Sequence, residues 1–422
     1  MTKYLKKFAN HNGYTAYTAD TQNYILPNVS YCVEQNECHF KGIIHDYSED
    51  YFTFVVRENG TQFMLSSYQD EYNQANVNTT KSDTKGGNTK AGSETLSYSI
   101  DGGETWSTIE RNTPTASFNG GTKVLWKGNL QPMSEYEGIG TFTSNDKNFD
   151  VEGNIMSLLF GDNFAGEDSL DGYTGVFAGL FAYTGDDGGG GIALNAVNTK
   201  SLTNSNTKSG SNYPKLINAK NLVLPATELS NSCYSNMFYN CRSLTSAPEL
   251  PATALTYGCY SAMFRNCYSL MDAPALPATT LAEGCYAYMF SNCYSLFEAP
   301  ELLATTLVDY CYVSMFYACE NISYIKAMFT GYPSSLYLGG GGGDNPKGGS
   351  VLKGTALTLF SGPSWVEGVA DSGTFVMNSN AQWINDVSFS VYNGYVPCWV
   401  VKDEFGNTVY NCSGPGPQVG PE

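Results

Sequence analysis

Histidine, the most common catalytic acid or base, is scarce in this chain. All three of its histidines, His11, His39 and His45, lie within the first 45 of 422 residues. A Ser-His-Asp or Cys-His arrangement elsewhere would need this segment to reach across the molecule. The 40 Asp and Glu residues offer many carboxylate pairs, but no spacing singles out a general acid and base for glycoside hydrolysis. The sequence therefore indicates that the chain is not an enzyme, with a carbohydrate-active enzyme as an alternative.

Two further groups could hold a metal or a phosphate. Cys32, Cys38 and His39 form a Cys-x5-Cys-His group, which could supply three zinc ligands. No fourth ligand is evident, so a structural thiol pair is favoured. Four successive glycines at 188–191 resemble part of a phosphate-binding loop, but no Gly-Lys-Ser/Thr follows them. We therefore expect no metal site and no cofactor.

Charge and hydropathy restrict the partners. The formal net charge of −18 argues against nucleic acid, because phosphate binding needs clustered Lys and Arg. No window approaches 18 apolar residues, so no membrane insertion is expected. The N-terminus has the basic start of a signal peptide without the apolar stretch that should follow, so export by that route is not expected.

The element that could position a binding surface is a 26-residue repeat. Cys233-Tyr234, Met237-Phe238 and Cys241 recur with the same spacing from Cys259, Cys285 and Cys311. Leu229, Cys233, Met237 and Cys241 are four residues apart, which predicts the apolar stripe of a helix. The segment that follows, Ser-Leu-x-x-Ala-Pro-x-Leu-Pro, is broken by proline and predicts an extended rung. Stacking such units predicts an α+β fold, a leucine-rich-repeat solenoid flanked by small β-rich modules.

Eight of the 12 cysteines occupy this stripe. If the stripe is helical, cysteines eight residues apart lie roughly 12 Å apart along the axis. Equivalent cysteines on neighbouring helices lie about 8–10 Å apart, beyond the roughly 7 Å limit for a disulfide. We therefore expect eight reduced core side chains, consistent with assembly in a reducing cytoplasm.

Four parts are predicted: an N-terminal adaptor at 1–45, a β-rich module at 46–150, the solenoid at 151–330, and a C-terminal β-rich module with a mobile tail at 331–422. In the second part, residues 51–57 predict a strand followed by a hairpin turn at 58–60, and 122–126 and 138–142 predict further strands of a small sandwich or barrel. Ser99–Trp106 matches the Asp-box pattern S-x-D-x-G-x-T-W and predicts a turn in which Asp101 bonds the backbone while Trp106 packs. Residues 154–159 predict a cap that begins the solenoid, and 176–181 a degraded first repeat. Residues 68–94, 185–212 and 339–361 are interpreted as inserted loops.

Positions that vary while the repeat stays constant are the candidates for ligand binding. If the rungs stack, the varying side chains form adjacent columns of aromatic, Met and acidic groups, which suit sugar rings or a protein surface. The candidate residues are Tyr268, Met271, Asp272, Tyr294, Phe297, Glu298 and Tyr324. The alternative is that these side chains are solvated or pack against the insertions.

The repeat Cys-Tyr-x-x-Met-Phe-x-x-Cys-x-Ser-Leu-x-x-Ala-Pro-x-Leu-Pro-Ala-Thr resembles the BspA-like leucine-rich repeats of Bacteroidales and their crAss-like phages. Residues 26–32, 153–159, 324–329 and 365–376 resemble the same group. The sequence departs from that pattern at Thr184, where a Cys would be expected, and at Leu303, where a Pro would be.

The resemblance implies one of two settings, a virion appendage or a bacterial cell-surface adhesin. The N-terminus without an apolar stretch, the reduced cysteines and the Lys-rich adaptor favour the virion. We therefore expect a non-enzymatic structural or adhesive phage protein, a head- or tail-fibre-like appendage. Its expected partners are other virion proteins, through residues 1–45, and a host cell-surface glycan or protein. A homo-oligomer is also expected.

Overall fold

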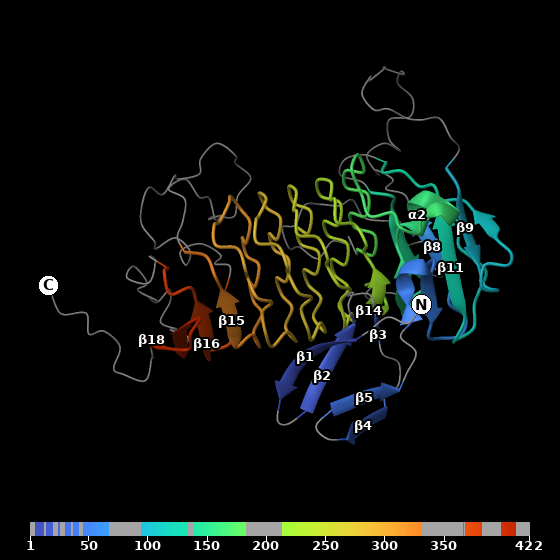
Figure 1. Cartoon of the computed structure of the whole chain (residues 1–422). Helices are drawn as coiled ribbons and strands as arrows, with labels where there is room; N and C mark the ends of the chain where they lie inside the picture. The colour runs from blue at the N-terminus through green and yellow to red at the C-terminus, as the bar shows by residue number, and fades with distance from the viewer. Residues whose placement is uncertain are drawn as a thin grey trace, which may run out of the picture.

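The computed structural model describes the side chains of residues 45–66, 94–133, 138–182, 213–330, 366, 368–381 and 399–409, and only the backbone of the strands between residues 5 and 41. The described chain is mostly β-strand and turn with very few helical residues (Figure 1). The β-rich content is thereby confirmed. The helices predicted as part of the α+β class are wrong, because the repeat segments expected to be helical are runs of consecutive turns.

The N-terminal strands form small antiparallel pairs. β1 (Leu5–His11) pairs with β2 (Tyr14–Ala19), and β4 (Ser30–Glu34) pairs with β5 (Glu37–Lys41). β3 (Tyr24–Ile25) pairs with β6 (His45–Asp46), which leads into the 3-10 helix η1 (Tyr47–Glu49). The side chains of Cys32, Cys38 and His39 lie outside the described part.

The module that follows contains two open sheets packed face to face. Six strands have the order β10-β9-β11-β7-β13-β14, and β8 pairs with β12 in the second sheet. Their bounds are β7 Phe52–Val56, β8 Phe63–Ser66, β9 Leu96–Ser99, β10 Ser107–Ile109, β11 Lys123–Gly128, β12 Thr141–Ser144, β13 Phe149–Asn154 and β14 Leu216–Val223. The Phe54 ring joins the two layers, 4.6 Å from the ring of Phe63 and 5.0 Å from that of Phe142. Neither sheet closes on itself within the described residues, so the arrangement is a sandwich and not a barrel.

The predicted β-hairpin after residue 57 is wrong. A turn with Gly60 at φ 81° does follow β7, but β7 pairs with β11 and β13 while β8 pairs with β12. The turn therefore carries the chain from one sheet to the other. Alternating strand patterns locate strands well, but they do not reveal which distant strand completes the ladder.

The Asp-box turn between β9 and β10 is confirmed. Asp101 Oδ1 accepts hydrogen bonds from the Thr105 backbone N–H at 3.0 Å and from the Ser99 hydroxyl at 2.7 Å. A hydrogen bond from the Thr105 hydroxyl, together with these two, holds the pKa of Asp101 well below its usual range. Trp106 packs beside Tyr51, with ring centroids 5.0 Å apart.

The predicted helical stripe is instead a run of consecutive turns. Within one repeat, the N–H groups of Met237 and Cys241 donate to carbonyls three residues earlier, at 3.2 and 3.0 Å. Alternate N–H groups, such as those of Asn236 and Phe238, donate to carbonyls of the next repeat at 2.8 and 2.9 Å. Half of the donors thus leave the run, which no α-helix allows.

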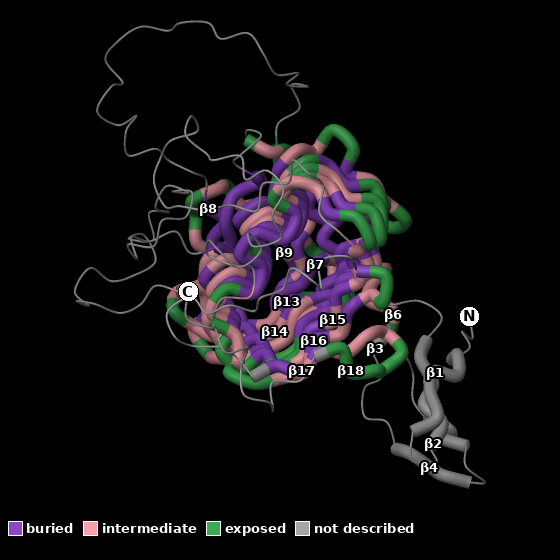
Figure 2. Tube along the Cα trace, turned by 90° about the vertical axis from the view of Figure 1, so that its left-hand side faces the viewer, coloured by how far each residue is buried: buried purple, intermediate pink, exposed green. Residues whose placement is uncertain are grey.

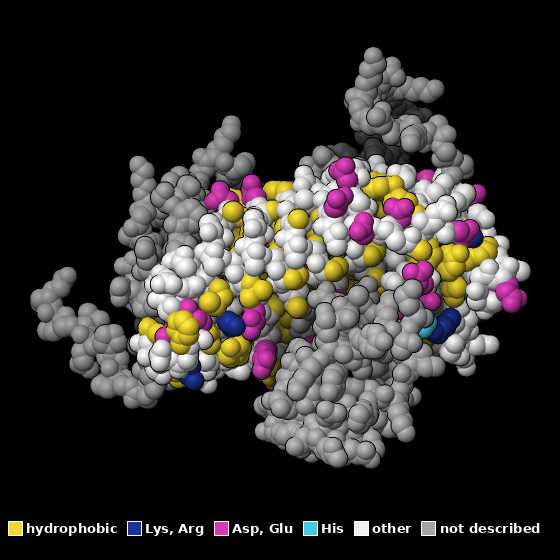
Figure 3. All heavy atoms as spheres, viewed as in Figure 1, with side chains coloured by type: hydrophobic (Ala, Val, Ile, Leu, Met, Phe, Trp, Pro, Cys, Tyr) yellow, Lys and Arg dark blue, Asp and Glu magenta, His cyan; other side chains and the backbone are white. Residues whose placement is uncertain are grey.

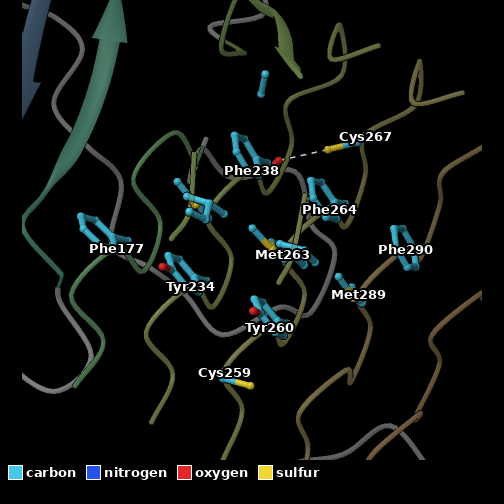
Figure 4. Close-up of a cluster of buried hydrophobic side chains, with 14 of the residues drawn as sticks. Phe177, Tyr234, Phe238, Cys259, Tyr260, Met263, Phe264, Cys267, Met289 and Phe290 are labelled. Carbon is cyan, nitrogen blue, oxygen red and sulfur yellow. Dashed lines mark hydrogen bonds between the residues drawn. The ribbon is translucent and has the colours of Figure 1, made fainter. Parts of the chain in front are cut away.

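Equivalent aromatic side chains of successive repeats stack face to face. The rings of Tyr234 and Tyr260 lie 5.7 Å apart and 5° from parallel, and those of Phe238 and Phe264 lie 5.3 Å apart and 3° from parallel (Figure 4). Both stacks continue through the third and fourth repeats. Their next members are Tyr286, Tyr312, Phe290 and Phe316.

The degraded first repeat belongs to the same stacks. Phe177 stacks on Tyr234 at 5.7 Å and Phe181 stacks on Phe238 at 5.5 Å, and their N–H groups donate to the carbonyls of Cys233 and Met237. The prediction for 176–181 is confirmed. The short helix α2 (Ser157–Phe160) and the 3-10 helix η2 (Gly161–Asn163) precede this repeat, in the position predicted for the cap.

Strand pairing continues from the N-terminal sheet into the repeats and beyond them. Ser246 bridges in parallel to Asn218 of β14 and to Asp272, and Glu298 bridges to Tyr324 of β15 (Tyr324–Ala327). β15 pairs with β16 (Ser372–Met377), β16 with β17 (Cys398–Asp403) and β17 with β18 (Thr408–Tyr410). One cluster of buried hydrophobic side chains runs through all these parts, and viewed along the repeats the buried residues fill the interior (Figure 2).

The C-terminal strands fit closely onto the last repeat. A Cβ at Gly373 would lie 2.2 Å from the backbone oxygen of Ser323, and one at Gly368 would lie 3.1 Å from the Cα of Ala318. Glycine is therefore required for β16 to approach this closely. The three predicted insertions lie wholly or almost wholly outside the described part, as do Thr184 and the tail after Tyr410; the insertions are 68–94, 185–212 and 339–361. The division into four domains stays a prediction.

Candidate functional site

The candidate residues lie in three adjacent columns along the repeats: Tyr268 and Tyr294, Met271 and Phe297, and Asp272, Glu298 and Tyr324. Each column takes one residue from every repeat, because equivalent residues are joined by backbone bonds. The N–H of Met271 donates to Thr245 O at 3.4 Å, and the N–H of Ser323 donates to Phe297 O at 3.1 Å. The geometry thus brings the predicted residues together, while their role stays a prediction.

The first column is a closed stack of flat groups. The guanidinium of Arg242 lies 3.4 Å from the ring centroid of Tyr213 and 4.7 Å from that of Tyr268. The ring of Tyr294 follows, 4.8 Å from Tyr268. Because Arg242 precedes Tyr268 by one repeat and Tyr294 follows it by one, both faces of Tyr268 are covered. Tyr268 is therefore a supporting residue, and burial raises the pKa of Tyr294 above its usual value.

The second column presents apolar surface to solvent. The side chain of Met271 is 48% exposed and that of Phe297 is 58% exposed, one repeat apart. The exposed carboxylates of Asp272 and Glu298 stand beside them. Figure 3 shows hydrophobic side chains lying along the repeats on one face of the molecule, with acidic groups among them. This column is where an external ring or apolar chain could make contact without displacing a buried residue.

Tyr324 marks the end of this surface. It lies in β15 and is half-buried, and Thr374 of the neighbouring strand β16 lies beside it. In the same strand, Lys326 Nζ forms an ion pair with Glu301 at 3.0 Å. The candidate surface is thus bounded on this side by the C-terminal strands.

A ladder of asparagine amides was not predicted from the sequence. Asn266 Nδ2 donates to Asn240 Oδ1 at 2.8 Å, and Asn292 Nδ2 donates to Asn266 Oδ1 at 2.7 Å. All three residues have positive φ, between 61° and 64°, a conformation that asparagine tolerates better than most residues. The usable signal is the recurrence of Asn directly before the second cysteine in three of the four repeats.

Exposed aromatic side chains of the turn runs were also missed. They occupy positions where the repeat pattern permits any residue, so the constant motif gave no signal for them. They are Tyr257, 56% exposed, and Tyr288, Tyr310 and Tyr317, each 36% exposed. Arg265 lies beside one of them, with its guanidinium 5.1 Å from the ring centroid of Tyr288.

The eight repeat cysteines are buried and free, as predicted. The second cysteine of each repeat donates its S–H to a carbonyl of the preceding repeat. Cys267 donates to Phe238 O at 3.2 Å (Figure 4), and Cys293 donates to Phe264 O at 3.2 Å. Burial raises the pKa of Cys259 to about 11 and that of Cys319 to about 12. These thiols are therefore protonated core groups and poor nucleophiles at neutral pH.

Across the described residues, no group of three or more His, Cys, Asp or Glu side chains is arranged to hold a metal ion. None of the helices in that same part of the chain has the length and hydropathy needed to cross a bilayer. Comparisons with protein-family models, curated proteins and solved structures found no match to this chain.

Proposed function

We propose that this chain is a non-enzymatic adhesive protein of a phage particle, in which a leucine-rich-repeat solenoid presents one side to a glycan or protein on the host surface. The observation that carries the proposal is the pair Met271 and Phe297, both exposed in successive repeats beside Asp272 and Glu298. Exposed apolar groups rimmed by polar ones are a common feature of binding surfaces.

The repeats support the solenoid part of the proposal. Equivalent residues recur every 26 positions, their rings stack and their backbones bond to the next repeat. Such a scaffold is stiff, because each repeat is held by both neighbours. A stiff scaffold holds Met271 and Phe297 at a fixed spacing, so little conformational entropy is lost on binding.

The proposed surface suits a ligand that is apolar on one face and hydroxylated on its edges. Such a ligand can cover Met271 and Phe297 while donating hydrogen bonds to the carboxylates of Asp272 and Glu298. Sugar rings have this character, as do tyrosine-rich protein surfaces. In the proposed particle, residues 1–45 attach the chain, so their deletion should yield particles that lack it.

The test is adsorption of particles carrying the double substitution Met271→Ser and Phe297→Ser. We expect adsorption to host cells to fall by about tenfold or more, because each exposed apolar anchor in an interface contributes on the order of 1–2 kcal/mol. Phe405→Ser is the matched control, since Phe405 is 75% exposed and lies in the turn after β17.

Unchanged adsorption by the double variant would refute the binding surface. Recovery of the chain in host envelope fractions and not in purified particles would favour the bacterial adhesin instead. Degradation of host capsular polysaccharide, abolished by a single carboxylate substitution, would favour the carbohydrate-active enzyme.

A further inference from the structure

A second surface, separate from Met271 and Phe297, carries a cation without a carboxylate partner. The repeats between residues 222 and 330 contain three basic side chains, Arg242, Arg265 and Lys326. Arg242 lies in the stack with Tyr268, and Lys326 is paired with Glu301. Within the described part of the chain, Arg265 has no carboxylate ion pair, and its buried Nε has no hydrogen-bond partner.

The surroundings of Arg265 hold it in place. The ring centroid of Tyr288 lies 5.1 Å from its guanidinium carbon and that of Tyr239 lies 5.9 Å away. Both distances allow a cation–π contact, which orients the planar group and leaves its N–H donors unused. The buried Nε is out of reach of an external group, but Arg265 as a whole is only half-buried, so an external acceptor at the rest of the guanidinium would be favoured here.

The chemistry of this donor set selects the acceptor. A guanidinium presents parallel N–H donors in a fixed fork, which matches the two oxygens of a carboxylate. The tyrosines on either side have flat apolar faces and a hydroxyl at the tip, as suits a sugar ring. An acidic sugar unit carries both a carboxylate and such a ring.

The arrangement along the repeats sets the size of the ligand. Tyr239, Arg265, Ser291 and Tyr317 occupy equivalent positions in four successive repeats, and Ser291 is 1% exposed. Three steps at the strand spacing of about 4.8 Å span roughly 14 Å. Because Ser291 is buried, the ligand contacts in this row are limited to Tyr239, Arg265 and Tyr317, and a ligand that reaches all three is longer than one sugar unit.

The charge of the rest of the repeats restricts how acidic the ligand can be. Against three basic groups stand eight acidic ones: Glu228, Glu249, Asp272, Glu283, Glu298, Glu301, Asp309 and Glu320. A dense polyanion would be repelled by this field, whereas one isolated carboxylate gains the contact with Arg265 at little cost. We propose that Arg265, with Tyr239, Tyr288 and Tyr317, binds an oligosaccharide in which a single acidic sugar, carrying one carboxylate, stands among neutral sugars.

The experiment is titration calorimetry of the full chain with three pentasaccharides. One consists of glucose units with a single central glucuronic acid, the second is all glucose, and the third is all glucuronic acid. We expect the singly charged ligand to bind about tenfold or more tightly than the neutral one, in line with one charge-assisted hydrogen-bonded pair. The fully charged ligand should bind less tightly than the singly charged one.

Three variants make the test specific to Arg265. Arg265→Gln should remove the preference for the singly charged ligand, and Arg265→Lys should retain only part of it, because a lysine keeps the charge and loses the fork. Lys326→Gln, which removes a cation elsewhere in the repeats, should keep the preference. Arg265→Lys also guards against misfolding of Arg265→Gln, which the unfolding midpoint monitors.

The proposal is overturned if the wild-type chain binds none of the three ligands, if it binds the neutral and singly charged ligands equally, or if Arg265→Gln keeps the preference. It does not depend on the proposed host adhesion, because different residues carry it. The double substitution of Met271 and Phe297 should leave the preference for the carboxylate unchanged, so the two proposals can be refuted separately.

Discussion

The eight cysteines show how a correct prediction can rest on a wrong distance. The sequence argument predicts their reduced state from the spacing of packed helices, about 8–10 Å. In the turn runs, equivalent rings lie 5.3–6.1 Å apart, so the backbones of equivalent cysteines approach the range in which disulfides form. The protonated thiols are favoured by burial in all eight cases and, for the second cysteine of each repeat, by an S–H bond to a carbonyl, and not by distance.

The buried thiols make stability fall at alkaline pH. Burial raises the pKa of Cys259 from 9.0 to about 11 and that of Cys311 to about 11. Between these values the unfolded chain has lost the proton that the folded chain keeps, so stability is complete below pH 9 and decreases as the pH rises toward 11. Each such thiol contributes a slope of about 1.4 kcal/mol per pH unit.

Urea unfolding at intervals from pH 8 to 10 measures this slope. Cys259→Ala should lower stability at every pH, because it leaves a cavity. It should also make the free energy of unfolding fall less steeply with pH, by about 1.4 kcal/mol per pH unit, which is the contribution of one thiol. A variant whose slope equals that of the wild type would show that Cys259 does not titrate as described.

At the scale of the element, the four-residue spacing of the buried side chains is real, but the helix that it predicts is wrong. A helix rotates about 100° per residue, so steps of four drift by roughly 40° each and by about 120° from Leu229 to Cys241. A true helical stripe therefore mixes steps of three and four. Consecutive turns have no such drift, and asparagine or glycine at Asn240, Gly258 and Asn266, all with positive φ, marks where the chain must bend.

The asparagine ladder should contribute measurably to stability. Asn266→Ala removes one donated and one accepted hydrogen bond, at 2.8 and 2.7 Å, and should lower the free energy of unfolding by about 2 kcal/mol. Alanine at this positive φ also adds backbone strain, a cost that the Asn236→Ala control shares. Equilibrium unfolding in urea measures the change.

Asn236→Ala is the matched control for the ladder. Asn236 has φ 56° and, in the part of the chain that the structure describes, its Nδ2 bonds to the neighbouring Ser235 hydroxyl. Its replacement should cost about 1 kcal/mol less than that of Asn266. Equal losses for the two variants would mean that the ladder adds nothing beyond a local turn.

At the scale of the whole molecule, the sequence predicted strands but not their continuity. The alternating patterns locate the module strands at 51–57 and 122–126, whereas the strand predicted at 138–142 begins only at Thr141. The parallel pairing of β13 with β14 and of β15 with β16 joins segments separated by long insertions, and no local pattern encodes such partners. The candidate columns could be predicted because the period alone aligns them, whereas the covering of Tyr268 by Arg242 required the side-chain geometry.

The docking of the C-terminal strands should depend on Gly373. A Cβ there would lie 2.2 Å from the Ser323 backbone oxygen, so Gly373→Ala should displace β16 and cost about 1–3 kcal/mol, as overpacking does. Amide hydrogen exchange should increase in β16, β17 and β18 while the repeats from Cys233 to Cys293 keep their protection.

Ser372→Ala, at the exposed start of β16, is the control for this experiment and should leave exchange unchanged. Protection of β16 that persists in Gly373→Ala would show that the last repeat adjusts to the added methyl group. Faster exchange throughout the repeats would show that the C-terminal strands stabilise the whole molecule and not only its end.

The equivalence of the interfaces between repeats makes the length of this protein adjustable. The same tyrosine, phenylalanine and asparagine contacts join the first full repeat to the second and the second to the third. Removal or duplication of one 26-residue unit would therefore join surfaces that already match. Unequal recombination within the gene could change the molecule's span in steps of about 5 Å, and the number of aromatic side chains it displays, without any new core having to evolve.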